Sequence, residues 1–277
     1  MTILVDDIKK LRDKTGAGMM ACKEALAATG GDVEAAVEHL RKKGIASADK
    51  KAGRATGDGL VASAIAADGR SGAIIEINCE TDFVAKTDQF RQLTESLAQW
   101  ALGQPNPEVT AEALPEDRAT LIKEAIAKIG ENIKLKRGSK LTVADGLVET
   151  YIHLGGKIGV LVALEAAAGP GLKPLARELA MQVAASSPLY VRRDQVPPEV
   201  IEKEKDIYRE QVRGSGKPEH VVENIVTGKL KKFYSEICLL EQAYIKDPNK
   251  TVEAVIREQM PGAPVTVSRF VRYRLGE

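Results

Sequence analysis

The densest cluster of polar side chains in the sequence is segment 76–86, which follows an apolar run. Glu80 and Asp82 are the two carboxylates that general acid and base catalysis would use. No second carboxylate motif or histidine motif accompanies them, so an active site here has little support. The alternative is structural: Thr81 or Asp82 caps a helix that follows, and Phe83 packs into the core beneath it. The residue pattern favours this structural interpretation over catalysis.

Other residues with chemical potential are scattered along the chain. Cys22, Cys79 and Cys238 are far apart and form no CxxC motif, which excludes a disulfide framework and a structural zinc site. The motifs GxxxxGK[ST], GxSxG and HExxH are absent, and no GxGxxG opens a helix. His153 fits a structural side chain better than a catalytic base. We therefore expect no cofactor, no metal and no catalytic residue.

Composition places the chain among ordinary globular proteins. Its 277 residues suffice for two or three domains, with 29% charged and 44% hydrophobic residues. Because 40 Lys and Arg face 39 Asp and Glu, no global field attracts nucleic acid or a membrane. The start lacks an apolar signal region, and no run reaches the roughly 20 apolar residues of a membrane span. We expect a reduced, cytoplasmic protein without a membrane partner.

Segment 41–54 is the most basic part of the chain, with six basic residues against one acidic residue. A solvated helix end followed by a linker accounts for this composition. An RNA-binding, translation-associated protein is the alternative, but RNA-binding surfaces interleave aromatic residues with basic ones. This segment has no aromatic residue. No direct contact with nucleic acid is expected.

Three short helices are predicted before residue 45. Leu4, Ile8 and Leu11 share one helical face, and a glycine-containing turn follows at 15–18. A second helix is predicted over 19–28, and a third begins after the cap residue Asp32 and ends at Gly44. A module this small has too little core to be very stable alone, so we expect it to dock onto a partner or a larger body.

The middle of the chain contains a repeat with an offset of 87 residues. A predicted β-hairpin over 59–77 recurs over 146–164, and each copy precedes an amphipathic helix. The sequence thus predicts an α+β fold with two related hairpin-plus-helix subdomains. A helix over 118–129 and the stretch 133–143 connect them, and a strand over 265–273 returns to one of the sheets.

A charged, helical segment follows residue 188. Two antiparallel helices, joined by a turn at 214–218, are predicted to form a coiled-coil hairpin inserted at about 196–240. The first helix has a weak apolar seam of Val196, Val200 and Ile207. The stronger seam of the second helix consists of Val222, Val226, Leu230, Phe233, Ile237 and Leu240.

Two long segments resemble the signatures of the bacterial translation elongation factor Ts family. They are 11–26, with the sequence LRDKTGAGMMACKEAL, and 76–86, with the sequence EINCETDFVAK. The resemblance extends to 128–132, 153–162, 228–233 and 269–271, and so covers nearly the whole chain. It implies a UBA-like N-terminal module over 1–54 and core subdomains over 55–143 and 144–277, the second carrying the inserted hairpin.

The resemblance implies a guanine-nucleotide exchange factor rather than an enzyme. Its partner would be elongation factor Tu, in the GDP-bound and nucleotide-free forms. In that family Asp82 and Phe83 would contact the GTPase, where the aromatic ring wedges beside the switch region and magnesium is displaced. Thr81 and Val84 would hold the shape of the loop.

The resemblance also implies contacts outside this loop. Met19, Met20 and Lys23 match the contacting segment of the N-terminal module. His153 matches an interface histidine of the second subdomain, although a packing role is open. In the family the helical hairpin is associated with self-association or extra contacts. Some members continue past the last strand into a helical segment, whose contacts are not expected here.

Overall fold

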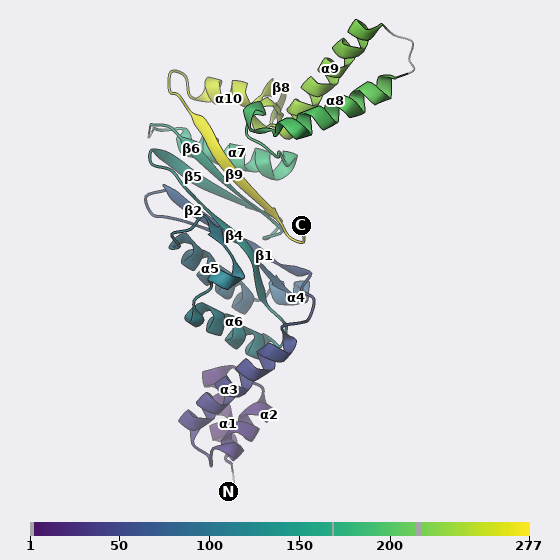
Figure 1. Cartoon of the computed structure of the whole chain (residues 1–277). Helices are drawn as coiled ribbons and strands as arrows, with labels where there is room; N and C mark the ends of the chain where they lie inside the picture. Colours follow the sequence, from purple (N-terminus) through teal and green to yellow (C-terminus); the bar gives the residue numbers. More distant parts are fainter. Residues whose placement is uncertain (1–2, 168, 214–217) are drawn as a thin grey trace. The chain divides into compact units, whose positions relative to one another are not determined.

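The structure is a computed structural model that describes residues 3–167, 169–213 and 218–277. Figure 1 labels its helices and strands. They form two compact units: Met1–Ala62 with Ile75–Gly138 and Leu275–Glu277, and Ser63–Ile74 with Ser139–Arg274. Across the described residues the fold is mixed α+β, as the sequence predicts. None of the described helices is long and apolar enough to cross a lipid bilayer.

The first unit begins with the three predicted helices, α1 (Val5–Thr15), α2 (Met19–Ala28) and α3 (Val33–Lys51). Gly16 ends α1 in the left-handed region, with φ of 68°. Asp32 caps α3 as predicted, because its carboxylate accepts hydrogen bonds from two backbone amides of the first turn. The small shared core consists of Ile8, Leu11, Cys22, Ala25, Leu26 and Ala36.

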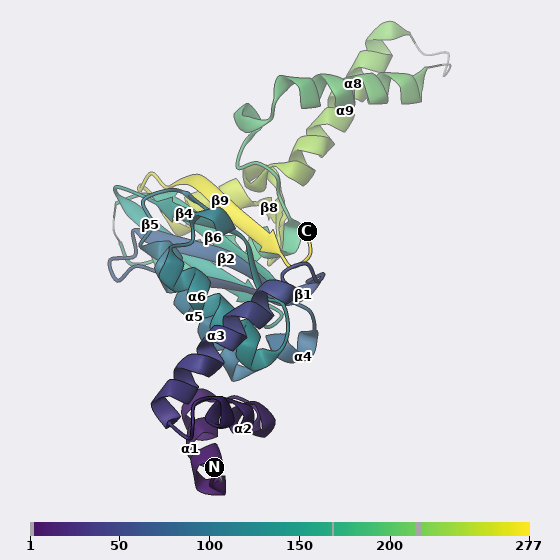
Figure 2. The same cartoon turned by 60° about the horizontal axis from the view of Figure 1, so that its bottom comes forward.

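The predicted end of the third helix at Gly44 is wrong. α3 continues through Gly44 to Lys51, and its second half packs against α6 (Glu116–Ile129), as Figure 2 shows. A Cβ at Gly44 would lie 2.7 Å from the Cβ of Ala127. Gly costs about 1 kcal/mol in a helix interior relative to Ala. Here the missing side chain permits the close helix contact, so tertiary packing overrides the local preference.

The first sheet has the strand order β1-β2-β4-β3. The predicted hairpin consists of β1 (Asp58–Ile65) and β2 (Ser71–Cys79), and its turn includes Gly69 with φ of 71°. The stretch 133–143, expected only as a connection, forms β4 (Lys134–Thr142). The other elements here are α4 (Asp82–Ala85), α5 (Asp88–Leu102), β3 (Glu108–Val109) and a 3-10 turn, η1 (Ala111–Ala113).

The second sheet is antiparallel, with the order β5-β6-β9. Its strands are β5 (Gly146–His153), β6 (Ile158–Glu165) and β9 (Thr266–Arg274), so the predicted returning strand is confirmed. α7 (Leu172–Ser186) packs against β5 and β6. Its fully buried Leu175, Leu179 and Val183 contribute to an extended apolar cluster of this unit.

Several elements of the second unit lack a clear sequence signal. They include β7 (Ala243–Tyr244), β8 (Asp247–Thr251) and α10 (Val252–Gln259), which contributes Val252, Val255 and Ile256 to the same core as α7. The 3-10 turns η2 (Arg193–Gln195) and η3 (Leu239–Glu241) flank the helical hairpin.

The hairpin helices are α8 (Pro198–Val212) and α9 (Glu219–Ile237), which pack against each other. Val226 of the predicted α9 seam is buried, and most of the other seam residues are half-buried. Ile207 is wrongly assigned to the α8 seam, since it is 40% exposed, whereas Val212 is buried. The predicted turn at 214–218 lies outside the described residues, except for Pro218.

Candidate functional site

Segment 80–87 leaves the buried end of β2 and forms the single turn of α4. Thr81 is the N-cap residue, and its Oγ1 accepts a hydrogen bond from the Val84 amide at 3.4 Å. Thr87 caps the next helix, α5, in the same way. The predicted capping role of Thr81 is confirmed. Two caps in quick succession fix the backbone on both sides of Phe83.

Phe83 does not pack into the core, so that part of the structural interpretation is wrong. Its side chain is 78% exposed, the highest exposure among the described large hydrophobic residues. Lys86 lies beside it, with Nζ 5.8 Å from the ring centroid and 2.6 Å from Oδ2 of Asp82. The turn therefore presents an aromatic ring together with a carboxylate and an ammonium group.

Two glutamates link this loop to the end of α6. Oε2 of Glu131 accepts hydrogen bonds from the amides of Glu80 and Thr81, both at 3.0 Å. In return, Oε1 of Glu80 accepts a hydrogen bond from the Asn132 amide at 2.7 Å. The Asn132 side chain, itself buried, donates to the carbonyl of Arg54 at 2.8 Å. The loop is thus held from two sequence-distant segments.

The same contacts argue against acid and base catalysis at this cluster. The hydrogen bond from the Asn132 amide, supported by Arg54, lowers the pKa of Glu80 and keeps it ionised. Asp82 is engaged by Lys86. Burial raises the pKa of the neighbouring Cys79 to about 12, which makes its thiol a poor nucleophile. Among the described residues there is also no cluster of three metal-ligating side chains.

The predicted contact residues of the N-terminal module lie at the start of α2. Met19 and Met20 are 46% and 67% exposed, and Lys23 is exposed one turn further on. Cys22 and Leu26 of the same helix are buried in the small core of the module. The module therefore presents two flexible apolar side chains and one cation to solvent.

His153 is the last residue of β5. It belongs to the second unit, whereas the loop of α4 belongs to the first. It is exposed, and its Nδ1 lies 2.8 Å from the hydroxyl oxygen of Tyr151. The next residue, Leu154, has φ of 49° and is 65% exposed. Leu154 was not among the predicted contact residues, although a leucine in a turn before Gly155-Gly156 is a signal for an exposed apolar side chain.

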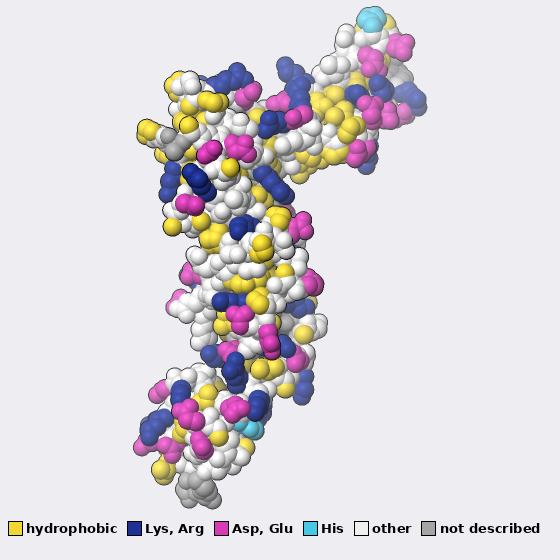
Figure 3. Space-filling view, turned by 60° about the vertical axis from the view of Figure 1, so that its left-hand side comes forward, with side chains coloured by type: hydrophobic (Ala, Val, Ile, Leu, Met, Phe, Trp, Pro, Cys, Tyr) yellow, Lys and Arg dark blue, Asp and Glu magenta, His cyan; other side chains and the backbone are white. Residues whose placement is uncertain are grey.

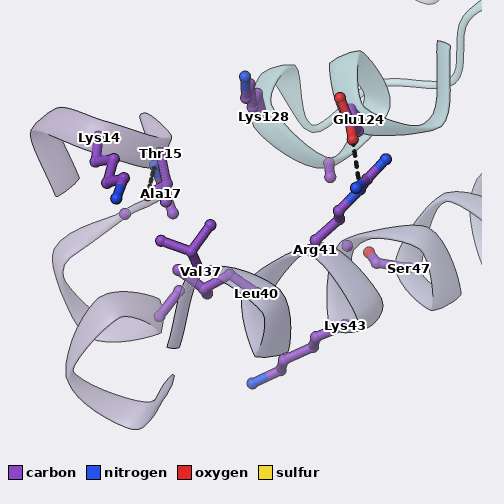
Figure 4. A pocket seen from close by; sticks show the side chains of 14 residues that line it. Lys14, Thr15, Ala17, Val37, Leu40, Arg41, Lys43, Ser47, Glu124 and Lys128 are labelled. Atoms are coloured by element: carbon purple, nitrogen blue, oxygen red, sulfur yellow. Dashed lines mark hydrogen bonds and ion pairs between the residues drawn. The ribbon is translucent and has the colours of Figure 1, made fainter. Parts of the chain in front are cut away.

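The basic segment 41–54 is helical up to Lys51, and its charges are largely paired. Arg41 contacts Glu124 of α6 at 2.8 Å, at the edge of a pocket between the N-terminal helices and α6 (Figure 4). Lys42 and Lys43 contact Glu38 and Glu24, both at 2.7 Å. On the face drawn in Figure 3, basic and acidic side chains are interspersed. This arrangement does not resemble the continuous basic surface of an RNA-binding domain.

Comparison with known proteins decides between the remaining alternatives. A family model described as "Elongation factor TS" matches residues 80–277. The chain belongs to the elongation factor Ts family. Elongation factor Ts of Prosthecochloris aestuarii is 49% identical to it, over 99% of both chains. That of Halothermothrix orenii is 46% identical, over 100% of this chain and 93% of the relative. That of Clostridium perfringens is 44% identical, over 98% and 92%.

Elongation factor Ts is the nucleotide exchange factor of elongation factor Tu in translation elongation, so this protein is an exchange factor and not an enzyme. The family resemblance of segments 11–26 and 76–86 is therefore confirmed. The alternatives of RNA binding and of catalysis by Glu80 and Asp82 are set aside.

Proposed function

We propose that segment 81–84 opens the nucleotide site of elongation factor Tu, with Phe83 as the inserted group. The exposure of Phe83 carries this proposal: a large aromatic ring stands in water on a backbone fixed by two caps and by Glu131. Aromatic side chains dominate binding energy where they enter a pocket on the partner. A rigid loop adds affinity because little conformational entropy is lost on binding.

The chemistry of the partner indicates how such a contact acts. A P-loop GTPase holds GDP through backbone amides around its phosphates and through a magnesium ion. Phe83, wedged beside the switch region, shifts that region, displaces magnesium and weakens the contacts to the β-phosphate. Asp82 takes part in the same contact. Thr81 and Val84 maintain the shape of the loop, since the Thr81 hydroxyl accepts a hydrogen bond from the Val84 amide.

Two further contacts complete the proposed interface. Met19 and Met20 offer adaptable thioether side chains beside the cation of Lys23. In the second unit, His153 and the adjacent exposed Leu154 form the other contact. Several contacts are needed because accelerating release by a factor on the order of 10³–10⁵ lowers the barrier by roughly 4–7 kcal/mol. One aromatic residue typically supplies about 2–4 kcal/mol.

Exchange by this route is linkage between two binding equilibria. The protein binds nucleotide-free elongation factor Tu more tightly than the GDP form. By reciprocity, GDP or GTP then weakens its binding by the same factor and expels it. Elongation factor Tu is thus bound in both forms, and the protein acts in catalytic amounts. We place this activity in the cytoplasm, or its organellar equivalent.

The test is release of fluorescent GDP from elongation factor Tu. We expect Phe83→Ala to slow release about 30-fold or more, the effect of losing roughly 2 kcal/mol. Its melting temperature should be unchanged, because the ring is exposed. Leu189→Ala is the matched control, since Leu189 is 68% exposed and lies outside the proposed contacts. Wild-type release rates for Phe83→Ala would overturn the proposal.

We also propose that residues 55–143 and 144–277 are related subdomains behind a UBA-like module over 1–54. Gly59 and Gly146, 87 residues apart, have φ of 145° and 139°. A Cβ at either position would lie 2.1 or 1.9 Å from a backbone oxygen, that of Ile77 or Leu164, which are again 87 residues apart. The recurrence of this unusual approach supports a duplicated hairpin.

The helical hairpin, about 196–240, is proposed as a self-association element. Ile207 supports this, because it leaves apolar surface on α8 that α9 does not cover. Ile207→Lys should shift the protein toward monomer in sedimentation velocity experiments. Asn224→Lys is the control, since it adds the same lysine at an exposed polar position of α9 and should leave sedimentation unchanged. Identical sedimentation of wild type and Ile207→Lys at all concentrations would exclude this role.

A further inference from the structure

Three side chains lie close together at the end of β5. The rings of Tyr151 and His153 stack with centroids 5.6 Å apart and planes inclined by 28°. The guanidinium of Arg177, from α7, lies 5.0 Å from the Tyr151 ring centroid. We propose that Tyr151 and Arg177 are positioning residues that fix the ring of His153 for the partner contact. This inference rests on the interface role of His153 given above.

Strand geometry explains why the two rings meet. Residues two apart in a strand lie on the same face of the sheet, so Tyr151 and His153 project together. His153 forms the last register pair of the hairpin, opposite Ile158, before the turn begins. An exposed side chain at such an end would lose rotamer freedom on binding a partner. Stacking on Tyr151 removes that freedom in advance.

Arg177 is itself well anchored. It donates a hydrogen bond to the backbone carbonyl of Thr150, and its guanidinium lies 3.7 Å from the carboxylate of Glu149. Both partners belong to β5, directly before Tyr151. Arg177 therefore joins α7 to the strand and holds the Tyr151 ring through a cation–π contact. The chain of support runs from the helix through Tyr151 to His153.

The hydrogen bond between the Tyr151 hydroxyl and Nδ1 of His153 couples the imidazole tautomer to the phenol, which can donate or accept. The two atoms lie 2.8 Å apart, and in one tautomer of the neutral ring the phenol hydroxyl donates to Nδ1. The proton of the neutral ring then resides on Nε2, which makes no bond to Tyr151. In that tautomer Nε2 is the ring nitrogen that can donate a hydrogen bond to an acceptor on the partner. The hydrogen bond made by one imidazole nitrogen commonly determines which nitrogen of a histidine carries the proton.

Tyr151→Phe separates the hydroxyl from the stacking ring. We expect it to slow GDP release from elongation factor Tu about fivefold, the typical effect of one hydrogen bond. In a His153→Ala background the same substitution should change nothing, because Tyr151 acts through His153. Imidazole nitrogen NMR of the free protein should show Nδ1 of His153 losing its bond and the tautomers mixing. Arg177→Lys, which keeps the cation, should retain more activity than Arg177→Ala.

The outcomes separate this inference from the function it rests on. If His153→Ala leaves release unchanged, the interface role of His153 falls, and this inference with it. If His153→Ala slows release but Tyr151→Phe does not, only the positioning role falls. Equal slowing by Tyr151→Phe with and without His153 would likewise overturn it, as would an unchanged imidazole spectrum.

Discussion

Thr81 donates its hydroxyl hydrogen to Oε1 of Glu131 at 2.7 Å, although 50 residues separate them in the sequence. The other oxygen of the same carboxylate accepts hydrogen bonds from the backbone amides of Glu80 and Thr81. One side chain thus satisfies three donors where β2 turns into α4. The position of Phe83 therefore depends on a residue outside its own segment.

Removing this carboxylate should impair both the loop and exchange. Glu131→Ala leaves two amides and a hydroxyl without their acceptor, so we expect a loss of about 1–3 kcal/mol in the free energy of unfolding. Faster hydrogen exchange at residues 80–84 should accompany slower GDP release. Glu131→Gln keeps one acceptor oxygen and should be milder in all three measurements. Wild-type release by Glu131→Ala would show that the loop needs no such support.

Lys86 should matter more for exchange than for stability. Its ion pair with Asp82 is exposed and worth at most about 1 kcal/mol, so Lys86→Ala should hardly change urea unfolding. Release should slow about two- to fivefold, because Asp82 and Phe83 lose a common neighbour. Lys42→Ala is the control, since its pair with Glu38 has the same i,i+4 spacing. If both variants release GDP equally fast, Lys86 does not organise the contact.

Glu178 should make stability depend on pH in the acid range. Burial disfavours its carboxylate, but hydrogen bonds from Gln259, Lys246 and Tyr244 outweigh this and lower its pKa to about 2. Because the folded pKa lies below the ordinary value of 4.5, the stabilisation is complete above that pH. It is lost as pH falls from about 4.5 toward 2.

The corresponding variant is Glu178→Gln. It should reduce the free energy of unfolding by about 2 kcal/mol at neutral pH. This value is smaller than the full pKa shift implies, because about a quarter of the side chain is exposed and solvent screens its charge. The difference from wild type should shrink toward pH 2. Urea unfolding at a series of pH values measures it. A pH-independent difference would mean that the carboxylate charge is not what stabilises α7 against β7 and α10.

Gly59 and Gly146, each close to the backbone of the next strand, should be sensitive to any added side chain. Gly59→Ala and Gly146→Ala place a Cβ about 2 Å from a backbone oxygen at positive φ, so each should cost more than ~2 kcal/mol. Gly228→Ala in α9 is the control. Apart from its chain neighbours and the backbone of its own helix, nothing described lies within 4 Å of its Cβ position, and it should gain about 1 kcal/mol. Thermal unfolding followed by circular dichroism compares the three variants.

Elements with local signals could be predicted from the residues alone. Periodicity identified both hairpins and the helices α5 and α7, because each buries one apolar face. Asp32 and Thr81 were predictable caps, since a cap bonds to amides two or three residues away. The family signatures supplied the function, and through it the candidate contact residues.

Features that depend on contacts between distant segments could not be predicted in this way. The sequence is compatible with a buried or an exposed Phe83. The direction of the turn after β2 exposes its side chain. Local preference predicts that a helix ends at Gly44. The helix continues because the absence of a side chain there leaves room for Ala127. Glu131 gave no signal of its own, because its donors lie about 50 residues earlier in the chain. Burial and hydrogen bonding between distant segments are set by the folded backbone, which local patterns do not encode.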